Sequence, residues 1–281
     1  MNRGYITFVQ NNDKVNYLNC AYLQALSLKV TNKINQYAVV VDRHTESLIT
    51  QQHRKIFDDV ISMPWGDQAH HERWKMSNEW KALIASPFDE TIKLEADLLF
   101  TGSVDHWWDI MSLKDVCFTM NVTDYKENIA TSRAYREVFD INNLPNIYAG
   151  FYYFKKTESS KQLFMTVKSI FENWDDVKNV ILKNARSQPR STDLAFALAT
   201  HILGIENFYL PGNVPMFTHM KGAIQGWYND SIWTDVVHHE VDKNYLTVGF
   251  QRQRLPFHYH YKEYANDSII AHYERLYYEQ T

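Results

Sequence analysis

The stretch from residue 92 to residue 100 constrains the fold most, because every second residue in it is apolar. A period of two predicts a β-strand with one face in a core, and it places Glu95 and Asp97 together on the other face. Two carboxylates so close, with no Cys or His beside them, suit Mg²⁺ or Mn²⁺ better than Zn²⁺. A divalent ion held there could bind a diphosphate. The alternative is a solvent-facing strand that carries two ordinary acids, since acid-x-acid is a short motif.

Strand-like runs alternate with segments of helical periodicity along most of the chain. The other expected strands cover residues 5–10, 37–41, 59–63, 116–121 and 147–154, the last interrupted by Gly150. The expected helices cover residues 16–28, 47–57, 78–85, 105–112 and 130–139, and then 159–173, 175–183 and 193–203. This alternation predicts an α/β fold with a mostly parallel central sheet flanked by helices, whose ligands bind at the carboxyl ends of the strands. No Pro-, Gly- or Ser-rich linker divides the chain, so we expect a single domain over residues 1–281 with a decorated C-terminal half.

The composition sets limits on class and compartment. Hydrophobic residues make up 45% of the 281 residues, which is enough for a proper core. The formal net charge of −4 shows no global basic excess, so it neither implies nor excludes a nucleic-acid partner. Cys20 and Cys117 fall on an expected helix and an expected strand, which favours two buried thiols over a disulfide. Without an apolar leader or a run near the ~18 apolar residues of a membrane span, we expect no membrane partner and a reducing cytoplasm.

Three short motifs of the first half occur in a recognisable order. Gln10, Asn11 and Asn12 follow the first expected strand, Tyr17 precedes Ser27-Leu28-Lys29, and Glu95-Ala96-Asp97 lies on the central strand. This order resembles nucleotide-sugar glycosyltransferases of the GT-A fold, in the glycogenin and galactosyltransferase-like family. The resemblance implies that the loop at Gln10 to Asn12 cradles the nucleoside and that Tyr17 packs on its base. It also implies that Glu95-Ala96-Asp97 replaces the family's Asp-x-Asp motif, which binds Mn²⁺ or Mg²⁺.

The second half matches the family in shorter pieces. Gly150 matches part of an Asn-x-Gly motif, and Asp193 matches the acid that contacts the donor sugar, which makes Asp97 and Asp193 the implied catalytic residues. His219 matches the third metal ligand, beside Glu95 and Asp97. The family's diphosphate-binding Lys, six residues after that His, is replaced by Gln225, so Lys221 or Lys75 could take its place.

Further motifs resemble glycosyltransferases carried by tailed phages of the T-even type. They are Pro87-Phe88, Glu95-Ala96-Asp97, Leu144-Pro145-Asn146-Ile147-Tyr148, Ser191-Thr192-Asp193, His219-Met220-Lys221 and His258-Tyr259-His260-Tyr261-Lys262. Such phages glycosylate 5-hydroxymethylcytosine in their own DNA with glucose or arabinose. This resemblance implies a UDP-sugar donor, a double-stranded DNA acceptor, and an arabinosyltransferase or glucosyltransferase activity in the host cell cytoplasm. Residues 1–125 would then bind nucleotide and metal, and residues 126–281 would bind the acceptor and supply a C-terminal lid.

Each of these residues also has an ordinary explanation. Glu95 could accept hydrogen bonds from the ribose rather than bind the metal, His219 could be a core or surface histidine, and Asp193 could be an acid of a helix's first turn. The lid candidates lie on a segment that mixes cations with aromatic residues, as a phosphate or nucleic-acid contact would, and that could equally be a packed terminal strand. They are Arg252, Arg254, His258 and His260.

The reaction leaves further alternatives open. Kinship with glycogenin suggests retention of configuration, whereas an inverting enzyme needs a carboxylate base, for which Asp124 and Asp230 are candidates. The acceptor could also be a cell-surface glycan or a protein. A third alternative is a sugar-nucleotide-binding protein without turnover, since Glu95 and Gln225 depart from the family pattern.

Overall fold

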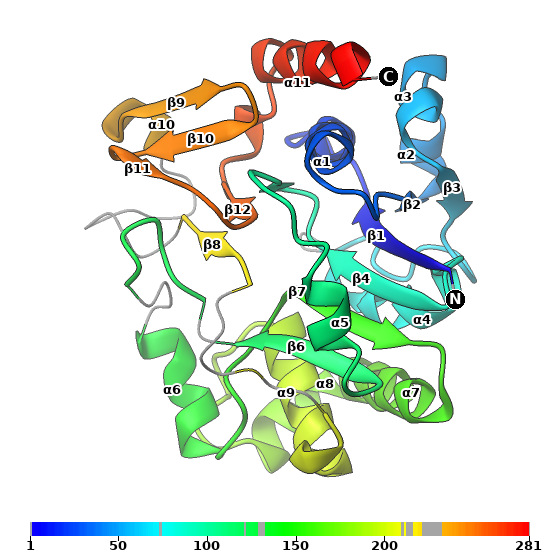
Figure 1. Cartoon of the computed structure of the whole chain (residues 1–281). Coiled ribbons are helices and arrows are strands. Elements are labelled where there is room, and N and C mark those ends of the chain that lie inside the picture. Colours follow the sequence, from blue (N-terminus) through cyan, green and yellow to red (C-terminus); the bar gives the residue numbers. More distant parts are fainter. Residues whose placement is uncertain are drawn as a thin grey trace.

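A six-stranded sheet forms the centre of the computed structural model (Figure 1). The structure describes residues 2–72, 75–120, 122–128, 133–208, 211, 216–220 and 232–280, apart from the side chains of 133–135. The strands are β1 (Arg3–Val9), β2 (Tyr37–Val41), β3 (Asp59–Ser62), β4 (Glu90–Leu94), β6 (Val116–Met120) and β7 (Ile147–Lys155). Their order is β3-β2-β1-β4-β7-β6; the pairs from β3 to β4 are parallel, and β7 runs antiparallel to both β4 and β6. The predicted α/β fold with a mostly parallel sheet is confirmed.

Helices cover both faces of this sheet. In Figure 1, α1 (Tyr17–Thr31) and α11 (Asp267–Gln280) lie above it, and α7 (Glu158–Glu172) and α9 (Thr192–Leu203) lie below it. Because successive strand residues face opposite sides, each strand supplies both layers: Tyr153 of β7 is buried in the α1 layer and Tyr152 in the layer of α7 and α9. The shorter helices are α2 (Arg43–Glu46), α3 (Gln51–Ile56), α4 (Ala82–Ala85), α5 (Trp107–Met111), α6 (Arg133–Ile141), α8 (Trp174–Asp176) and α10 (Trp233–Val236).

Two predicted helices differ in extent from those observed. The helix expected over 47–57 is the shorter α3, because Thr50 and His53 form reciprocal side-chain caps that start it at Gln51. The helix expected over 175–183 is α8 followed by a π-helical turn at Val177–Ile181. Asn16 caps α1 and Ser191 caps α9, as their residue types predict.

The continuous strand predicted for residues 92–100 is wrong. β4 ends at Leu94, Ala96 and Asp97 lie in a turn, and the chain resumes as β5 (Leu98–Leu99). Gln24 of α1 explains the break: its fully buried amide donates to the carbonyls of Glu95 (2.6 Å) and Leu98 (3.2 Å). A side chain therefore satisfies polar backbone groups that a continuing strand would pair.

The chain after the turn joins a different, smaller sheet. β5 pairs antiparallel with β12 (Phe257–His258), which pairs parallel with β8 (Thr218–His219). This pairing brings a segment from near the C-terminus to the end of β4. The segment that carries the predicted lid is thus partly a packed strand, with His258 buried and Arg252 and Arg254 exposed.

The remaining strands form a separate antiparallel sheet, β9 (His239–Asp242), β10 (Tyr245–Val248) and β11 (Gln251–Arg252). Cys20 on α1 and Cys117 on β6 are both buried and free, as predicted. Within the described part of the chain, no helix has the length and apolarity needed to cross a bilayer.

Candidate metal and donor site

Three potential metal ligands meet at the carboxyl end of β4. One ligand atom each of Glu95, Asp97 and His258 lies within 4.8 Å of the other two. His258 Nε2 is 2.8 Å from Asp97 Oδ2 and 3.3 Å from Glu95 Oε2. The turn that ends β4 thus directs both acids of the predicted pair toward one point, and it places them at the edge of the sheet where ligands of such folds bind.

The backbone around the turn fixes this arrangement. The Gln24 amide donates to the carbonyls of Glu95 and Leu98, and the Tyr259 N–H donates to the Asp97 carbonyl at 3.1 Å. Gly150 allows the Glu95 carboxylate to approach, since a Cβ there would lie 2.9 Å from Glu95 Oε2. β7 continues through Gly150, but its register with β6 shifts beside it, between Phe118 and Thr119, as strands often do next to functional sites.

Lys262 is the fourth group at this point. Its Nζ lies 2.5 Å from Asp97 Oδ2 and donates to the His260 carbonyl at 2.9 Å. Burial on its own would raise the pKa of Asp97, but His258 and Lys262 together hold that pKa well below 3.8. Burial likewise acts to lower the pKa of Lys262, and Asp97 more than reverses the effect, so the pKa is raised. The pair is therefore a carboxylate and an ammonium.

His219, the metal ligand implied by resemblance, lies beside this group. It is buried on β8, and its ring centroid is 4.5 Å from that of His258 and 5.4 Å from that of His260. The described residues whose ligand atoms converge are Glu95, Asp97 and His258, so a direct role for His219 stays a prediction. His258 itself was expected only in the lid, although its motif with Lys262 is visible in the sequence.

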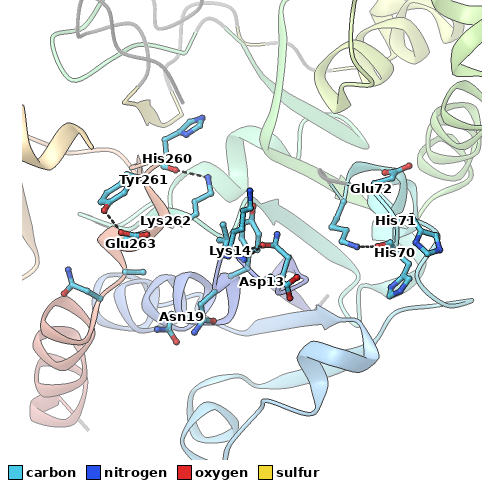
Figure 2. A pocket seen from close by; sticks show the side chains of 17 residues that line it. Asp13, Lys14, Asn19, His70, His71, Glu72, His260, Tyr261, Lys262 and Glu263 are labelled. Carbon is cyan, nitrogen blue, oxygen red and sulfur yellow. Dashed lines mark hydrogen bonds between the residues drawn. The ribbon is translucent and has the colours of Figure 1, made fainter. Parts of the chain in front are cut away.

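A cavity of about 1010 Å³ lies next to Asp97, which it reaches through its lining residue Lys262. Its walls come from residues 12–17 and Asn19, from residues 70–72 and Lys75, and from residues 260–263, 265 and 266, and Figure 2 shows Lys14 between the other two walls. Lys14, Lys75 and Lys262 bring positive charge to a lining that also contains Asp13, Glu72 and Glu263. Tyr17 lines the cavity, and burial raises its pKa to about 12 despite the nearby Lys262. A phosphorylated ligand with a ring suits such walls.

The other predicted donor residues divide into two groups. Asn12 and Lys75 line the cavity, and the Lys75 ammonium donates to the carbonyls of Ala69 and His70. Gln10 and Asn11 bind protein groups instead: Gln10 contacts Asp42 and Asn78, and the Asn11 side chain contacts Asn16 and the Leu18 N–H. Ala96 is buried in the turn between the two acids. Lys221, Gln225 and Asp230 lie outside the described residues.

Asp193 lies under β7 at the start of α9. Its carboxylate accepts from the Ala149 N–H (2.8 Å) and forms an ion pair with Arg136 (2.9 Å), whose guanidinium also lies over the Tyr148 ring at 4.6 Å. Burial raises the pKa of Asp193, more than Arg136 lowers it. No sequence motif pointed to Arg136. Asp124, a candidate base, accepts from two backbone N–H groups of its own turn, those of Lys126 and Asn128.

A second cavity of about 620 Å³ shares Tyr261, Glu263 and Asn266 with the first. Its other walls include Asp235, Glu240 and the hydroxyl groups of Thr234 and Ser268, and no Lys or Arg occurs among its described lining residues. Acids and hydroxyls at this density suit a neutral, hydroxyl-rich ligand better than an anion.

Comparisons with known proteins find similarity in structure only. No family model and no curated protein sequence matches the chain. The glycosyltransferase GlyE of Streptococcus pneumoniae TIGR4 is similar over 75% of this chain and 45% of its own, at 12% identity and a TM-score of 0.46. Mouse xyloside xylosyltransferase 1 covers 75% of this chain and 85% of its own, at 10% identity and a TM-score of 0.46. The galactosyltransferase LgtC is similar over 74% of this chain and 72% of its own, at 10% identity and a TM-score of 0.48. The similarity thus spans less than half the length of GlyE.

Proposed function

We propose that the protein is a glycosyltransferase that uses a nucleoside diphosphate sugar and a divalent cation held by Glu95, Asp97 and His258. One observation carries the proposal: these three ligands converge on one point, and Lys262, which contacts Asp97, lines a large cavity that also holds Lys14 and Lys75. An octahedral Mg²⁺ with bonds of about 2.1 Å holds adjacent ligand atoms about 3 Å apart. The 2.8 and 3.3 Å distances from His258 Nε2 to the two carboxylates therefore fit such an ion.

Each group has a separate task in this proposal. A bound Mg²⁺ or Mn²⁺ would supply Lewis-acid neutralisation of the leaving diphosphate. Lys262 and Lys14 face the same cavity and would stabilise negative charge on the departing phosphates. Tyr17 would pack on the nucleoside ring, as the sequence predicts, and Asp193, held by Arg136, would keep β7 in position beside Glu95.

We propose UDP-glucose or UDP-arabinose as donor and 5-hydroxymethylcytosine in phage DNA as acceptor, in the cytoplasm of a host cell. The T-even-type motifs support this choice, including the segment that holds both His258 and Lys262. The modified base would have to leave the helical stack to reach the donor. The exposed Arg252 and Arg254 on the neighbouring strand segment are the predicted backbone contacts.

A neutral glycan is the second candidate acceptor. The second cavity supports it, because Asp235, Glu240 and Glu263 would repel the phosphates of a nucleic acid while accepting hydrogen bonds from sugar hydroxyls. This cavity adjoins the donor cavity through Tyr261, so an acceptor bound there would lie next to the donor.

Labelled donor separates these proposals. The full chain with Mn²⁺ and UDP-[¹⁴C]glucose or UDP-[¹⁴C]arabinose is incubated with hydroxymethylated DNA, unmodified DNA or lipopolysaccharide, and label is followed into each. We expect label in hydroxymethylated DNA, and its loss with EDTA and in Asp97→Ala. Label in lipopolysaccharide alone would establish the glycan acceptor. Donor binding without either hydrolysis or transfer would mean that the protein only binds sugar nucleotides.

A further inference from the structure

Asp97 already has two partners where a metal ion would bind. His258 Nε2 and Lys262 Nζ lie 2.8 and 2.5 Å from the same oxygen, Oδ2, and Asp97 is only 4% exposed. A divalent ion bonded to this oxygen at about 2.1 Å would lie only about 4 Å from an ammonium that stays at 2.5 Å, so the two cations would repel each other. Metal binding therefore favours movement of Lys262 away from Asp97.

The His258 ring can keep its position when a metal ion binds. Its Nδ1 is buried without a hydrogen-bond partner among the described residues, so only the carboxylates favour a proton on Nε2. When a cation binds Nε2, the ring proton has a vacant position on Nδ1. The ring therefore needs no rotation, and the mobile partner is Lys262.

The Lys262 ammonium can move from Asp97 into the large cavity. Its side chain is 21% exposed and lines the large cavity, where Lys14 supplies a further positive charge. A rotation of the four-carbon stem would take the ammonium from Asp97 into this cavity, with no change in the backbone. A diphosphate bound in the cavity would then replace the carboxylate as its partner.

We propose that Lys262 and the divalent cation exchange at Asp97, so that Lys262 neutralises the carboxylate before loading and pairs with the donor diphosphate afterwards. This inference rests on the proposed function, because it assumes a diphosphate in the cavity. Glu95, Asp97 and Lys262 carry a summed charge of −1, and a divalent ion changes it to +1 beside a displaced ammonium. Lys262 therefore opposes the binding of a metal ion alone and favours the binding of a metal ion together with a nucleotide.

The exchange requires metal and nucleotide to bind cooperatively. Couplings between sites in proteins typically amount to 5–150-fold, and the same factor acts in both directions. We expect UDP to increase the Mn²⁺ affinity of the full chain by roughly 10-fold or more. Mn²⁺ should increase the UDP affinity by the same factor.

Mn²⁺ binding with and without UDP, followed by electron paramagnetic resonance of free Mn²⁺, tests the exchange without any turnover. Lys262→Met keeps the stem but removes the charge, and we expect it to bind Mn²⁺ alone at least about 5-fold more tightly and to lose most of the UDP effect. Lys14→Met is the matched control, because it removes a cavity cation that does not touch Asp97. It should leave the affinity for Mn²⁺ alone unchanged. Lys262→Gln repeats the test with a polar side chain if the Met variant does not fold.

The outcomes separate the inference from the proposed function. If Lys262→Met binds Mn²⁺ alone no better than wild type, or keeps the full UDP effect, the exchange is overturned while the glycosyltransferase proposal stands. If UDP does not bind at all but Lys262→Met still gains Mn²⁺ affinity, the function is overturned and the competition at Asp97 remains. If neither wild type nor variants bind Mn²⁺ with or without UDP, both are overturned.

Discussion

The sequence predicts both Asp97, which is buried, and Asp193, whose side chain is 14% exposed, to be catalytic, yet the two acids have different kinds of partner. Asp97 faces His258 and Lys262, two side chains from a short segment beside a cavity. Asp193 faces a backbone N–H and Arg136, which also donates to the Ile147 carbonyl and lies over aromatic rings. Burial therefore does not by itself distinguish a ligand-binding acid from a structural one. The distinction depends on whether the partners can be exchanged for a ligand.

The electrostatics of the two acids differ in sign. Burial is the largest influence on both, but His258 and Lys262 together overcome it at Asp97 and Arg136 does not at Asp193, so the pKa of Asp97 is lowered and the pKa of Asp193 is raised. Asp97 is thus poised as an anion that attracts cations. Burial acts against the charge of Asp193, while Arg136 and the Ala149 N–H act in its favour, which suits a residue that positions β7 against α9.

Replacement of Asp97 should have the largest effect on function. Asp97→Asn keeps the shape but removes the charge that holds both Lys262 and a metal, so we expect sugar transfer to fall by about 10²–10³-fold. Mn²⁺ binding should become undetectable under the same conditions. Transfer rates and Mn²⁺ titration measure the two effects. If Asp97→Asn retains Mn²⁺ binding, Asp97 is not the exchangeable acid and the contrast with Asp193 fails.

Replacement of Asp193 should act mainly on stability. Asp193→Asn leaves the buried Arg136 guanidinium without its counter-charge, and breaking such a pair costs about 3 kcal/mol of unfolding free energy. Urea unfolding measures this cost, with Mn²⁺ binding expected to stay as in wild type. A variant of unchanged stability whose transfer collapses would instead establish Asp193 as a donor-sugar contact, as the sequence predicts.

Gly150 lies beside Glu95 and follows Ala149, whose N–H binds Asp193, so it sharpens the comparison. Gly150→Ala would place a Cβ 2.9 Å from Glu95 Oε2, and the flexible carboxylate would have to shift. We expect Mn²⁺ affinity to fall by about 10-fold, as for other groups that orient metal ligands, with little change in unfolding free energy. The backbone bond from Glu95 to Gly150 and the contact of Asp193 with Ala149 remain available in this variant. A large loss of stability with unchanged metal affinity would refute this assignment.

The sequence predicts the main sheet better than it predicts the site. Strand β2 is a buried apolar run, and its extent is found correctly because short-range composition decides it. The alternation through residues 92–100 was real, but Gln24 ends the strand through contacts 71 and 74 residues away. Sequence periodicity indicates which residues are buried, and it does not indicate a hydrogen-bond partner from a distant part of the chain. The structure does bring Glu95 and Asp97 together, but through a turn and not on the face of a continuous strand.

His258 and Lys262 show why the rest of the site was missed. β12 is two residues long and carries no periodic signal, and it reaches Asp97 across 161 residues of sequence through pairing with β5. The motif that contains both residues was visible, but its spacing gives no role to either. Arg136 was missed for a related reason, since an arginine on an amphipathic helix ordinarily faces solvent. Only the folded contact with Asp193 assigns it a partner.

The dependence of stability on pH gives the smallest effect and tests the sign of the comparison directly. The folded-state pKa of Asp193 is raised above 3.8, so as pH falls from neutral toward 3.8 the folded state takes up its proton first and wild type gains stability relative to Asp193→Asn. The folded-state pKa of Asp97 is lowered, so its contribution is complete above 3.8 and is lost only below that value. Urea unfolding at a series of pH values should therefore show the difference in unfolding free energy between wild type and Asp193→Asn widening on acidification. The difference in unfolding free energy between wild type and Asp97→Asn should narrow below pH 3.8. A gap for Asp193→Asn that narrows instead would mean that Arg136 outweighs burial, and that the two acids differ in their partners but not in the sign of their electrostatics.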